Sequence, residues 1–156
     1  MRHFCTLFDS NYLDRGLVLH ESLVQQSKDF HLYIIPFDEE ARRILESLRL
    51  SNVTLIPLSD FENDDLLRVK PSRTRAEYCW TSTPYALDYV LNRFGVAQCT
   101  YLDADLCFYG DPGLLLDEMG ERSVLITEHR YTKEYDQSAT SVIYCVQFLS
   151  IKNTTD

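Results

Sequence analysis

Cys99-Thr100-Tyr101-Leu102-Asp103-Ala104-Asp105 is the stretch that decides the fold of this 156-residue chain, because an apolar run ends there in two closely spaced carboxylates. The four residues 99–102 predict a short buried strand. In open parallel sheets, ligands bind outside the carboxyl ends of the strands. The stretch therefore predicts a strand that delivers Asp103 and Asp105 to a ligand-binding edge.

The spacing of the two carboxylates suits a divalent cation. In extended backbone, residues i and i+2 point to the same side, so Asp103 and Asp105 can address one ion. Two neighbouring carboxylates repel each other, and a cation between them keeps both ionised. Hard oxygen ligands favour Mg²⁺ or Mn²⁺, and such sites recruit substrate phosphates. A chance pair of aspartates in a solvated turn is the competing interpretation.

Upstream of this stretch, short β-rich runs alternate with helical patterns. Strands are expected at residues 4–8, 32–35 and 53–56, and helices at residues 11–26 and 39–48. This β-α-β-α-β order is typical of a parallel sheet with right-handed crossovers. The first strand ends in Asp9-Ser10-Asn11-Tyr12, which brings an acceptor, an amide and an aromatic ring to the same edge.

The remaining segments are less regular. Residues 59–75 carry acidic residues first and basic residues afterwards, and they fit either a solvated loop or a contact for an anionic ligand. A helix is expected to begin with Thr83 as N-cap and Pro84 in its first position, and to end at Gly95. Two further strands are expected at residues 123–127 and 142–149.

Composition narrows the classes of function. The chain has 15 Lys+Arg and 24 Asp+Glu, a formal net charge of −9, which argues against broad binding to nucleic acid or anionic lipid. No apolar run approaches the roughly 20 residues of a membrane helix, and no secretory leader is expected. Five cysteines without a Cys-x-x-Cys pair indicate reduced thiols in a cytoplasmic protein, with a peripheral position at the inner face of the membrane as an option.

Together the motifs resemble the sugar-nucleotide glycosyltransferases of the GT-A fold. The resemblance rests on residues 4–12, the helix after them and residues 101–112, and it is greatest for the family 8 type and related bacterial enzymes. It implies a three-layer α/β/α, Rossmann-like, mostly parallel sheet in one nucleotide-sugar-binding domain over residues 1–156. Members of that family continue with an Asp-Gln-type segment and a late metal-ligating histidine, so the resemblance implies a domain incomplete at its C-terminus.

The resemblance also implies a reaction and a site. The reaction is retaining hexosyl transfer from a UDP-sugar to a glycan, a lipid-linked acceptor or another small molecule, with Mn²⁺ or Mg²⁺ held by Asp103 and Asp105. The implied nucleotide contacts are Thr6, Leu7, Phe8, Asp9, Asn11, Tyr12, Arg75, Asp103, Ala104 and Asp105. Cys145 and Gln147 are implied on the side of the donor sugar and acceptor, although the family usually has asparagine in place of Cys145. Arg73 or Arg75 is expected to replace an arginine that the family carries in the next helix.

Two other functions fit parts of the sequence. A haloacid-dehalogenase-like phosphohydrolase also places Asp-x-Asp after an apolar strand, but that class requires Thr or Val where this chain has Cys107. A domain that binds nucleotide, or only a partner, without turnover is the second alternative. A phosphatase assay distinguishes the first, and a measurable rate of UDP-sugar hydrolysis or transfer excludes the second.

Overall fold

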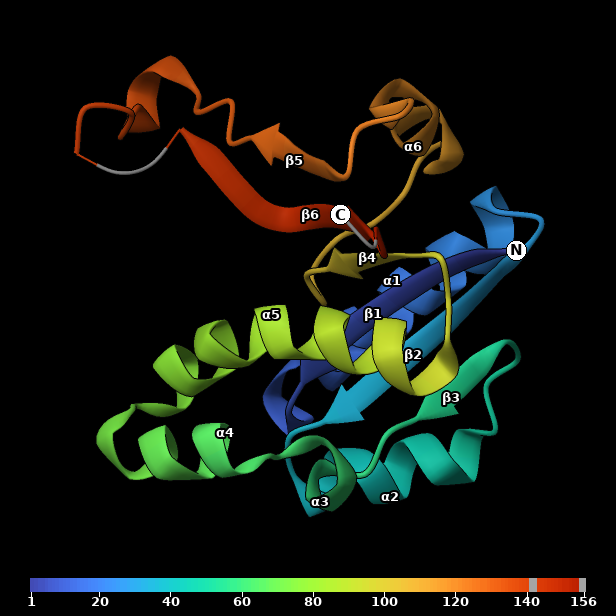
Figure 1. Ribbon diagram of the computed structural model, residues 1–156, viewed down its shortest axis with the longest axis vertical. Helices are drawn as coiled ribbons and strands as arrows, with labels where there is room; N and C mark the ends of the chain where they lie inside the picture. Colours follow the sequence, from blue (N-terminus) through green and yellow to red (C-terminus); the bar gives the residue numbers. More distant parts are fainter. Residues whose placement is uncertain (141–142, 155–156) are drawn as a thin grey trace.

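The computed structural model describes residues 1–140 and 143–154, and it contains one six-stranded sheet in the order β3-β2-β1-β4-β6-β5 (Figure 1). The strands are β1 Arg2–Phe8, β2 Phe30–Pro36, β3 Val53–Leu55, β4 Gln98–Leu102, β5 Val124–Glu128 and β6 Tyr144–Lys152. The first four are parallel, and β6 runs antiparallel to both β4 and β5. The sheet is therefore mostly parallel, as the β-α-β order predicts.

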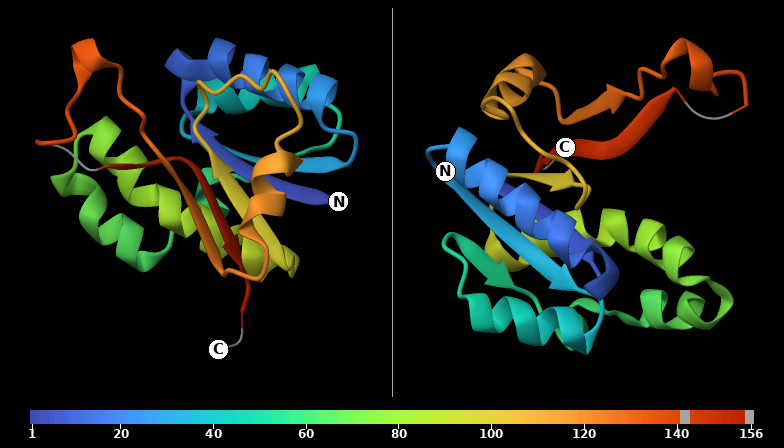
Figure 2. Two further views of the ribbon diagram at one scale, coloured as in Figure 1. Left: turned by 90° about the horizontal axis from the view of Figure 1, so that it is seen from above. Right: turned by 180° about the vertical axis from the view of Figure 1, so that it is seen from behind.

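Helices cover the two faces of the sheet (Figure 2). The α-helices are α1 Leu13–Gln26, α2 Glu39–Leu48, α3 Leu58–Phe61, α4 Asp64–Val69, α5 Arg75–Phe94 and α6 Gly113–Met119. Short 3₁₀ turns are η1 Ser10–Tyr12, η2 Lys70–Ser72 and η3 Lys133–Tyr135. Residues of α1 and α2 pack in one buried cluster, and residues of α3, α4 and α5 pack in the other. The predicted three-layer α/β/α architecture is confirmed.

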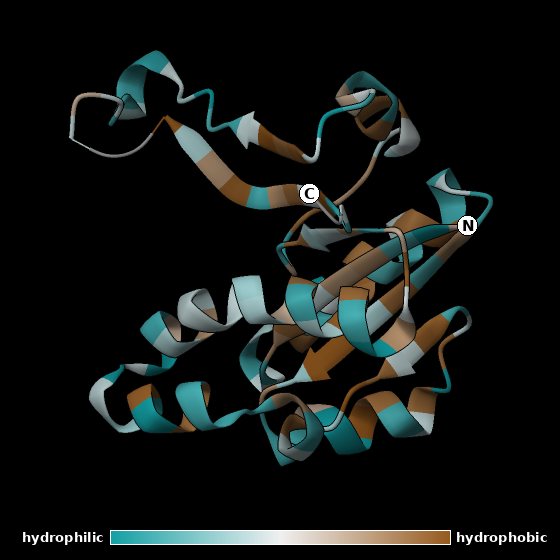
Figure 3. Ribbon diagram, in the orientation of Figure 1, coloured by the Kyte–Doolittle hydropathy of each residue, from teal (hydrophilic) through white to brown (hydrophobic). Residues whose placement is uncertain are grey.

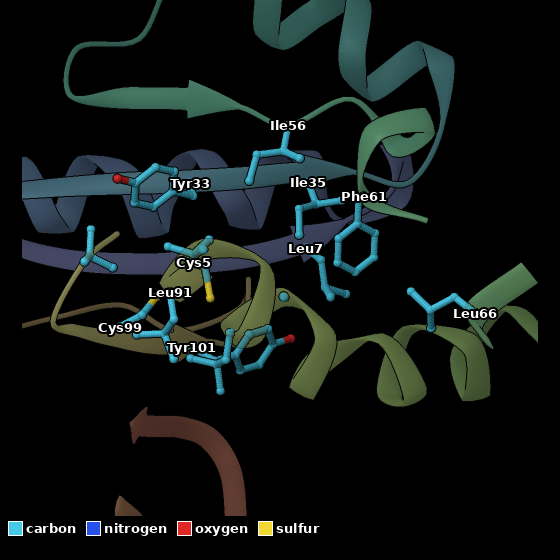
Figure 4. Close-up of a cluster of buried hydrophobic side chains, with 14 of the residues drawn as sticks. Cys5, Leu7, Tyr33, Ile35, Ile56, Phe61, Leu66, Leu91, Cys99 and Tyr101 are labelled. Atoms are coloured by element: carbon cyan, nitrogen blue, oxygen red, sulfur yellow. The ribbon is translucent and has the colours of Figure 1, made fainter. Parts of the chain in front are cut away.

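Strand β1 supplies both layers of the core, because its side chains alternate between the two faces. Cys5 and Leu7 face α5, in the cluster drawn in Figure 4. Phe4 and Phe8 belong to the cluster on the α1 side. A parallel strand buried on both faces is continuously apolar, which is why residues 4–8 read as a strand without polar alternation.

The helix before the acidic stretch is longer than the sequence indicated. Thr74, and not Thr83, is the N-cap of α5, and it forms a capping box with Glu77. Pro84 lies inside the helix. The capping box satisfies the first free N–H groups, and burial of the helix against the sheet outweighs the hydrogen bond that the proline loses. Gly95 ends the helix at φ 62°, as expected.

Two further segments differ from what the sequence indicated, and the cause in both is packing that a short window of sequence does not reveal. Residues 59–75 are not a solvated loop but fold into α3, α4 and η2, with Phe61 and Leu66 buried. Helix α6 begins at Gly113, after Pro112, and was not expected. Strand β6 begins at Tyr144, and Val142, included in the expected strand, lies outside the described residues. Among the described residues, no helix is both long and apolar enough to cross a bilayer.

Candidate functional site

A cleft of about 420 Å³ opens where β1 and β4 end. Strands β1 and β4 are neighbours, with Cys5 beside Tyr101, so two motifs more than ninety residues apart meet at one edge of the sheet. The cleft is lined by Leu7, Phe8, Asp9, Asn11, Tyr12, Arg75, Ala76, Cys79, Trp80, Tyr101, Asp103, Ala104 and Asp105. Every expected nucleotide contact except Thr6 lines this cleft.

The turn after β1 is held by the side chain of Asp9. One carboxylate oxygen accepts the backbone N–H of Asn11 at 2.9 Å, and the backbone N–H of Tyr12 donates to the Asp9 carbonyl at 3.0 Å. The Tyr12 side chain is 44 % exposed, with the Arg15 guanidinium 4.4 Å from its ring centroid. The turn thus directs a carboxylate, an amide and an aromatic ring to the cleft.

Arg75 joins this turn to the start of α5. Its Nε lies 2.6 Å from Asp9 Oδ2, and its Nη2 donates to Asp38 Oδ2 at 2.7 Å. Asp38 is also the N-cap of α2, since its side chain accepts the N–H of Ala41 at 2.8 Å. Arg73, the alternative to Arg75, is not among the residues that line the cleft, and it lines a neighbouring hollow with Lys70.

Asp38 therefore lies at the junction of α2, the β1 turn and α5. Its Oδ2 also accepts the backbone N–H of Ser10 at 3.0 Å and the Ser10 hydroxyl at 2.8 Å. Burial acts to raise the pKa of Asp38, but the hydrogen bonds from Ala41, Ser10 and Arg75 outweigh it and lower the pKa to about 2. A carboxylate that remains ionised in this way keeps the Arg75 guanidinium over the rim of the cleft.

Asp103 and Asp105 end the opposite wall. The backbone N–H of Asp103 donates to the Gln147 carbonyl at 2.9 Å, and the N–H of Leu106 donates to the Asp103 carbonyl at 3.1 Å. Burial raises the pKa of the Asp103 carboxyl, a hydrogen bond from Tyr101 opposes this rise, and the charge of Asp105 adds to it. A bound cation would stabilise the ionised form of Asp103 against both its burial and the repulsion by Asp105.

The donor set fits a divalent ion only in part. No group of three or more His, Cys, Asp or Glu side chains suited to a metal occurs in the described part of the chain. Two carboxylates remain, both with hard oxygen atoms, and Mg²⁺ and Mn²⁺ commonly complete such a shell with water and substrate phosphates. The residues present therefore fit a metal held jointly by protein and ligand.

Three expected site residues lie outside the cleft. Thr6 is fully buried on the α1 side of β1, and its hydroxyl has no hydrogen-bond partner among the described residues. Cys145 pairs with Thr127 across β6 and β5. Gln147 lines a second hollow of about 460 Å³ together with Leu106 and Phe148, although its carbonyl accepts the N–H of Asp103.

Sequence reasoning missed four lining residues, namely Ala76, Cys79, Trp80 and Tyr101. Three of these belong to the first turns of α5, which the expected start at Thr83 had left outside the helix. The capping-box pattern Thr74-x-x-Glu77 was the signal that could have placed them. Tyr101 precedes Asp103 by two residues on the same side of β4, so period-two alternation could have found it.

Comparison with known proteins places the chain among glycosyltransferase folds. No family model matches the sequence. Two relatives from Bacillus subtilis (strain 168) match, the uncharacterized protein YfnF at 35% identity over 125 residues and the uncharacterized protein YfnD at 31% over 134 residues. These alignments cover 80% and 85% of this chain but 41% and 43% of the relatives. The chain thus spans about two fifths of the length of the curated relatives it matches.

Solved structures show the same architecture. Galactosyltransferase LgtC, in complex with donor and acceptor sugar analogs, superposes with a TM-score of 0.61 at 14% identity, over 96% of this chain and 57% of that one. GlyE of Streptococcus pneumoniae TIGR4 gives 0.54 at 17% identity, over 98% and 34%. Mannosyltransferase PcManGT of Pyrobaculum calidifontis, in complex with GDP-Man and Mn²⁺, gives 0.52 at 12% identity, over 97% and 45%. The chain therefore has the fold of the GT-A glycosyltransferases.

Proposed function

We propose that the chain forms the nucleotide-sugar-binding part of a glycosyltransferase of the family 8 type that uses a UDP-sugar and a divalent metal. One observation carries the proposal: the Asp9-Ser10-Asn11-Tyr12 turn and the Asp103-Ala104-Asp105 stretch line the same cleft at the carboxyl edge of the sheet. Ligands of open α/β sheets bind at this edge. The glycosyltransferase fold of the neighbours supports the same assignment.

In this proposal the base and ribose occupy the β1 end of the cleft. Asp9 and Asn11 offer an acceptor and an amide, and the half-exposed Tyr12 ring offers a stacking surface. Leu7 and Phe8 line the floor, whereas Thr6 contributes backbone only, because its side chain is buried in the α1 layer. Hydrogen-bonding groups beside an aromatic face are the combination that recognises a nucleobase.

The diphosphate lies toward Asp103 and Asp105 in this arrangement. The two aspartates would hold Mn²⁺ or Mg²⁺, which when bound supplies positive charge against the departing diphosphate. Arg75 adds a fixed guanidinium at the opposite rim, kept in place by Asp9 and Asp38. The chain carries a net charge of −9, so this local positive charge is what makes an anionic ligand acceptable there.

The sugar side of the reaction is proposed next to β6. Cys145 and Gln147 lie in β6, the strand next to β4, and we place them on the side of the donor sugar and acceptor. The Gln147 carbonyl accepts the backbone N–H of Asp103. A retaining hexosyl transfer to a glycan, a lipid-linked acceptor or another small molecule is proposed. A cytoplasmic location, peripheral to the inner face of a membrane for a lipid-linked acceptor, accompanies it.

Calorimetry with UDP tests the nucleotide and metal roles. We expect Mn²⁺ to strengthen UDP binding at least about tenfold, the equivalent of about 1.4 kcal/mol. The double variant Asp103→Ala/Asp105→Ala should lose this dependence on the metal. The matched control is Asp60→Ala/Asp88→Ala, which removes two exposed carboxylates outside the cleft and should leave UDP binding unchanged.

Two results would contradict the proposal. Absence of UDP binding to the unaltered chain in Mn²⁺ would reject a nucleotide site, and metal-dependent binding that survives the double variant would reject the metal ligands. Hydrolysis of an aryl phosphate that is lost in Asp103→Ala would favour the phosphohydrolase alternative instead. Turnover of a UDP-sugar, measured as released UDP, separates an enzyme from a domain that only binds nucleotide.

A further inference from the structure

Trp80 is the single tryptophan of the chain, and its side chain is 71% exposed although it lines the cleft. Isolated exposed apolar side chains are common on protein surfaces, so exposure alone carries no inference. The place of Trp80 in the cleft and the absence of partners for its side chain are more informative. Within residues 1–140 and 143–154, Trp80 has no ring contact, ion pair or hydrogen bond to its side chain.

The helical geometry of α5 places Trp80 on the β4 side of the cleft. Arg75 and Trp80 are five residues apart, about 140° around the helix and about 7.5 Å along its axis. Among the α5 residues that line the cleft, Arg75 lies nearest to β1 and β2, since it reaches Asp9 and Asp38 at the ends of these strands. Trp80 lies at the opposite side of this group of residues. Because the sheet order is β2-β1-β4, that side faces β4 and Asp103.

Of the aromatic residues that line the cleft, Phe8 and Tyr101 are buried, and Tyr12 is the other exposed one. Tyr12 comes from the turn that leads into α1, on the other face of the sheet from α5. One face of its ring is covered by the Arg15 guanidinium. The indole of Trp80 has no such cover within the described structure, so its face is available to a ligand.

We propose that Trp80 stacks against the pyranose ring of the sugar substrate in this cleft, a role that rests on the proposed function. If the base lies at Asp9 and the diphosphate at Asp103, a ring carried beyond the diphosphate lies on the β4 side, where the geometry puts Trp80. A pyranose presents a face of C–H groups whose hydrogens carry partial positive charge. The electron-rich face of an indole matches them, and the contact removes apolar area from water on both partners.

Trp80 reports on its own contact, because no other tryptophan contributes to the emission. Titrations in Mn²⁺ with UDP, UDP-glucose and UDP-galactose should show a larger change in Trp80 fluorescence for a UDP-sugar than for UDP. Lactose added to the chain saturated with UDP and Mn²⁺ tests a saccharide acceptor by the same signal. A response to a UDP-sugar assigns the ring to the donor, and a response only to lactose assigns it to the acceptor.

Variants measured by calorimetry complete the test. Trp80→Ala should weaken binding of the responding sugar ligand about tenfold and leave UDP binding within twofold, while Trp80→Phe should retain most of the affinity. Tyr109→Ala is the matched control, since Tyr109 is 91% exposed and lies outside the cleft.

Equal losses for UDP and for the sugar ligands would place Trp80 on the nucleotide and overturn the proposal. No fluorescence response to any sugar, or no loss in Trp80→Ala, would overturn it as well. Failure of UDP to bind the unaltered chain rejects the proposed function and the stacking role with it. Normal UDP binding without a sugar-specific loss rejects only the stacking role.

Discussion

The two parts of the sheet differ in how completely they are buried. In β1 and β2, every residue from the third position onward is buried, whereas exposed and half-buried residues alternate along β5 and the first half of β6. Val124, Ile126 and Val146 are among the exposed apolar side chains of the antiparallel pair, which extends away from α2, α3 and α4 in Figure 3. The parallel part therefore contains most of the core and carries the cleft, while β6 joins it through β4 and adds Phe148 to the core.

The largest difference in the free energy of unfolding is expected between two isoleucine truncations, one in each part of the sheet. Ile34 in β2 is fully buried, and Ile126 in β5 is 38% exposed. Ile34→Ala should lower the free energy of unfolding by about 3–4 kcal/mol, because it leaves a cavity. Ile126→Ala should cost less than about 1 kcal/mol. Urea titrations of both variants check this, and similar losses would show that β5 belongs to the same core.

The junction between the two parts should give the next largest effect. Thr100 and Gln98 of β4 both donate to the buried Ser150 hydroxyl of β6, each at 2.9 Å. Ser150→Ala leaves those donors without this acceptor and should cost about 2 kcal/mol in urea unfolding. Ser123→Ala, at an exposed serine just before β5, is the control and should cost little. An equal, small effect in both would show that the hydroxyl network does not join the strands.

The pH dependence of stability should report on Asp38 in the parallel part. Its pKa falls from an ordinary 3.8 to about 2 in the folded chain, so its contribution is present above about pH 4 and is lost as the pH falls toward 2. After allowance for solvent screening of a partly exposed carboxylate, the contribution is about 1 kcal/mol. In Asp38→Asn, the free energy of unfolding should change less between pH 4 and pH 2 than in the unaltered chain. An unchanged slope would mean that the ionised Asp38 carboxylate, with its hydrogen bonds from Ala41, Ser10 and Arg75, does not stabilise the fold.

The smallest effect is expected at the exposed position of β5. Val124 is 53% exposed, and threonine keeps the β-branched shape that a strand favours. Val124→Thr should change the free energy of unfolding by no more than about 0.5 kcal/mol, measured by thermal or urea unfolding. A loss near that of Ile34→Ala would show that the exposed face of β5 is part of the core.

Much of the parallel part was predictable because its signals are local. The strands at residues 4–8, 32–35 and 99–102 are continuous apolar runs. The Asp38 carboxylate begins α2 as its N-cap, and Gly95 ends α5 in the left-handed backbone conformation. The start of α5 was misjudged because Pro84 is a strong local signal for a first helical turn. Burial of Tyr78 and Ser82 overrides that signal, and burial depends on contacts from distant parts of the chain.

The candidate site divides in the same way. The sequence by itself determined that Asp9, Asn11, Asp103 and Asp105 follow apolar strands, and therefore that they end at the binding edge of a parallel sheet. Only the tertiary structure decided that Arg75 bridges Asp9 and Asp38, that Trp80 lines the cleft, and that Thr6, Cys145 and the Gln147 side chain do not. Strand order and helix position bring those residues together or keep them apart, and both are set by which apolar faces bury each other, a property of the whole chain.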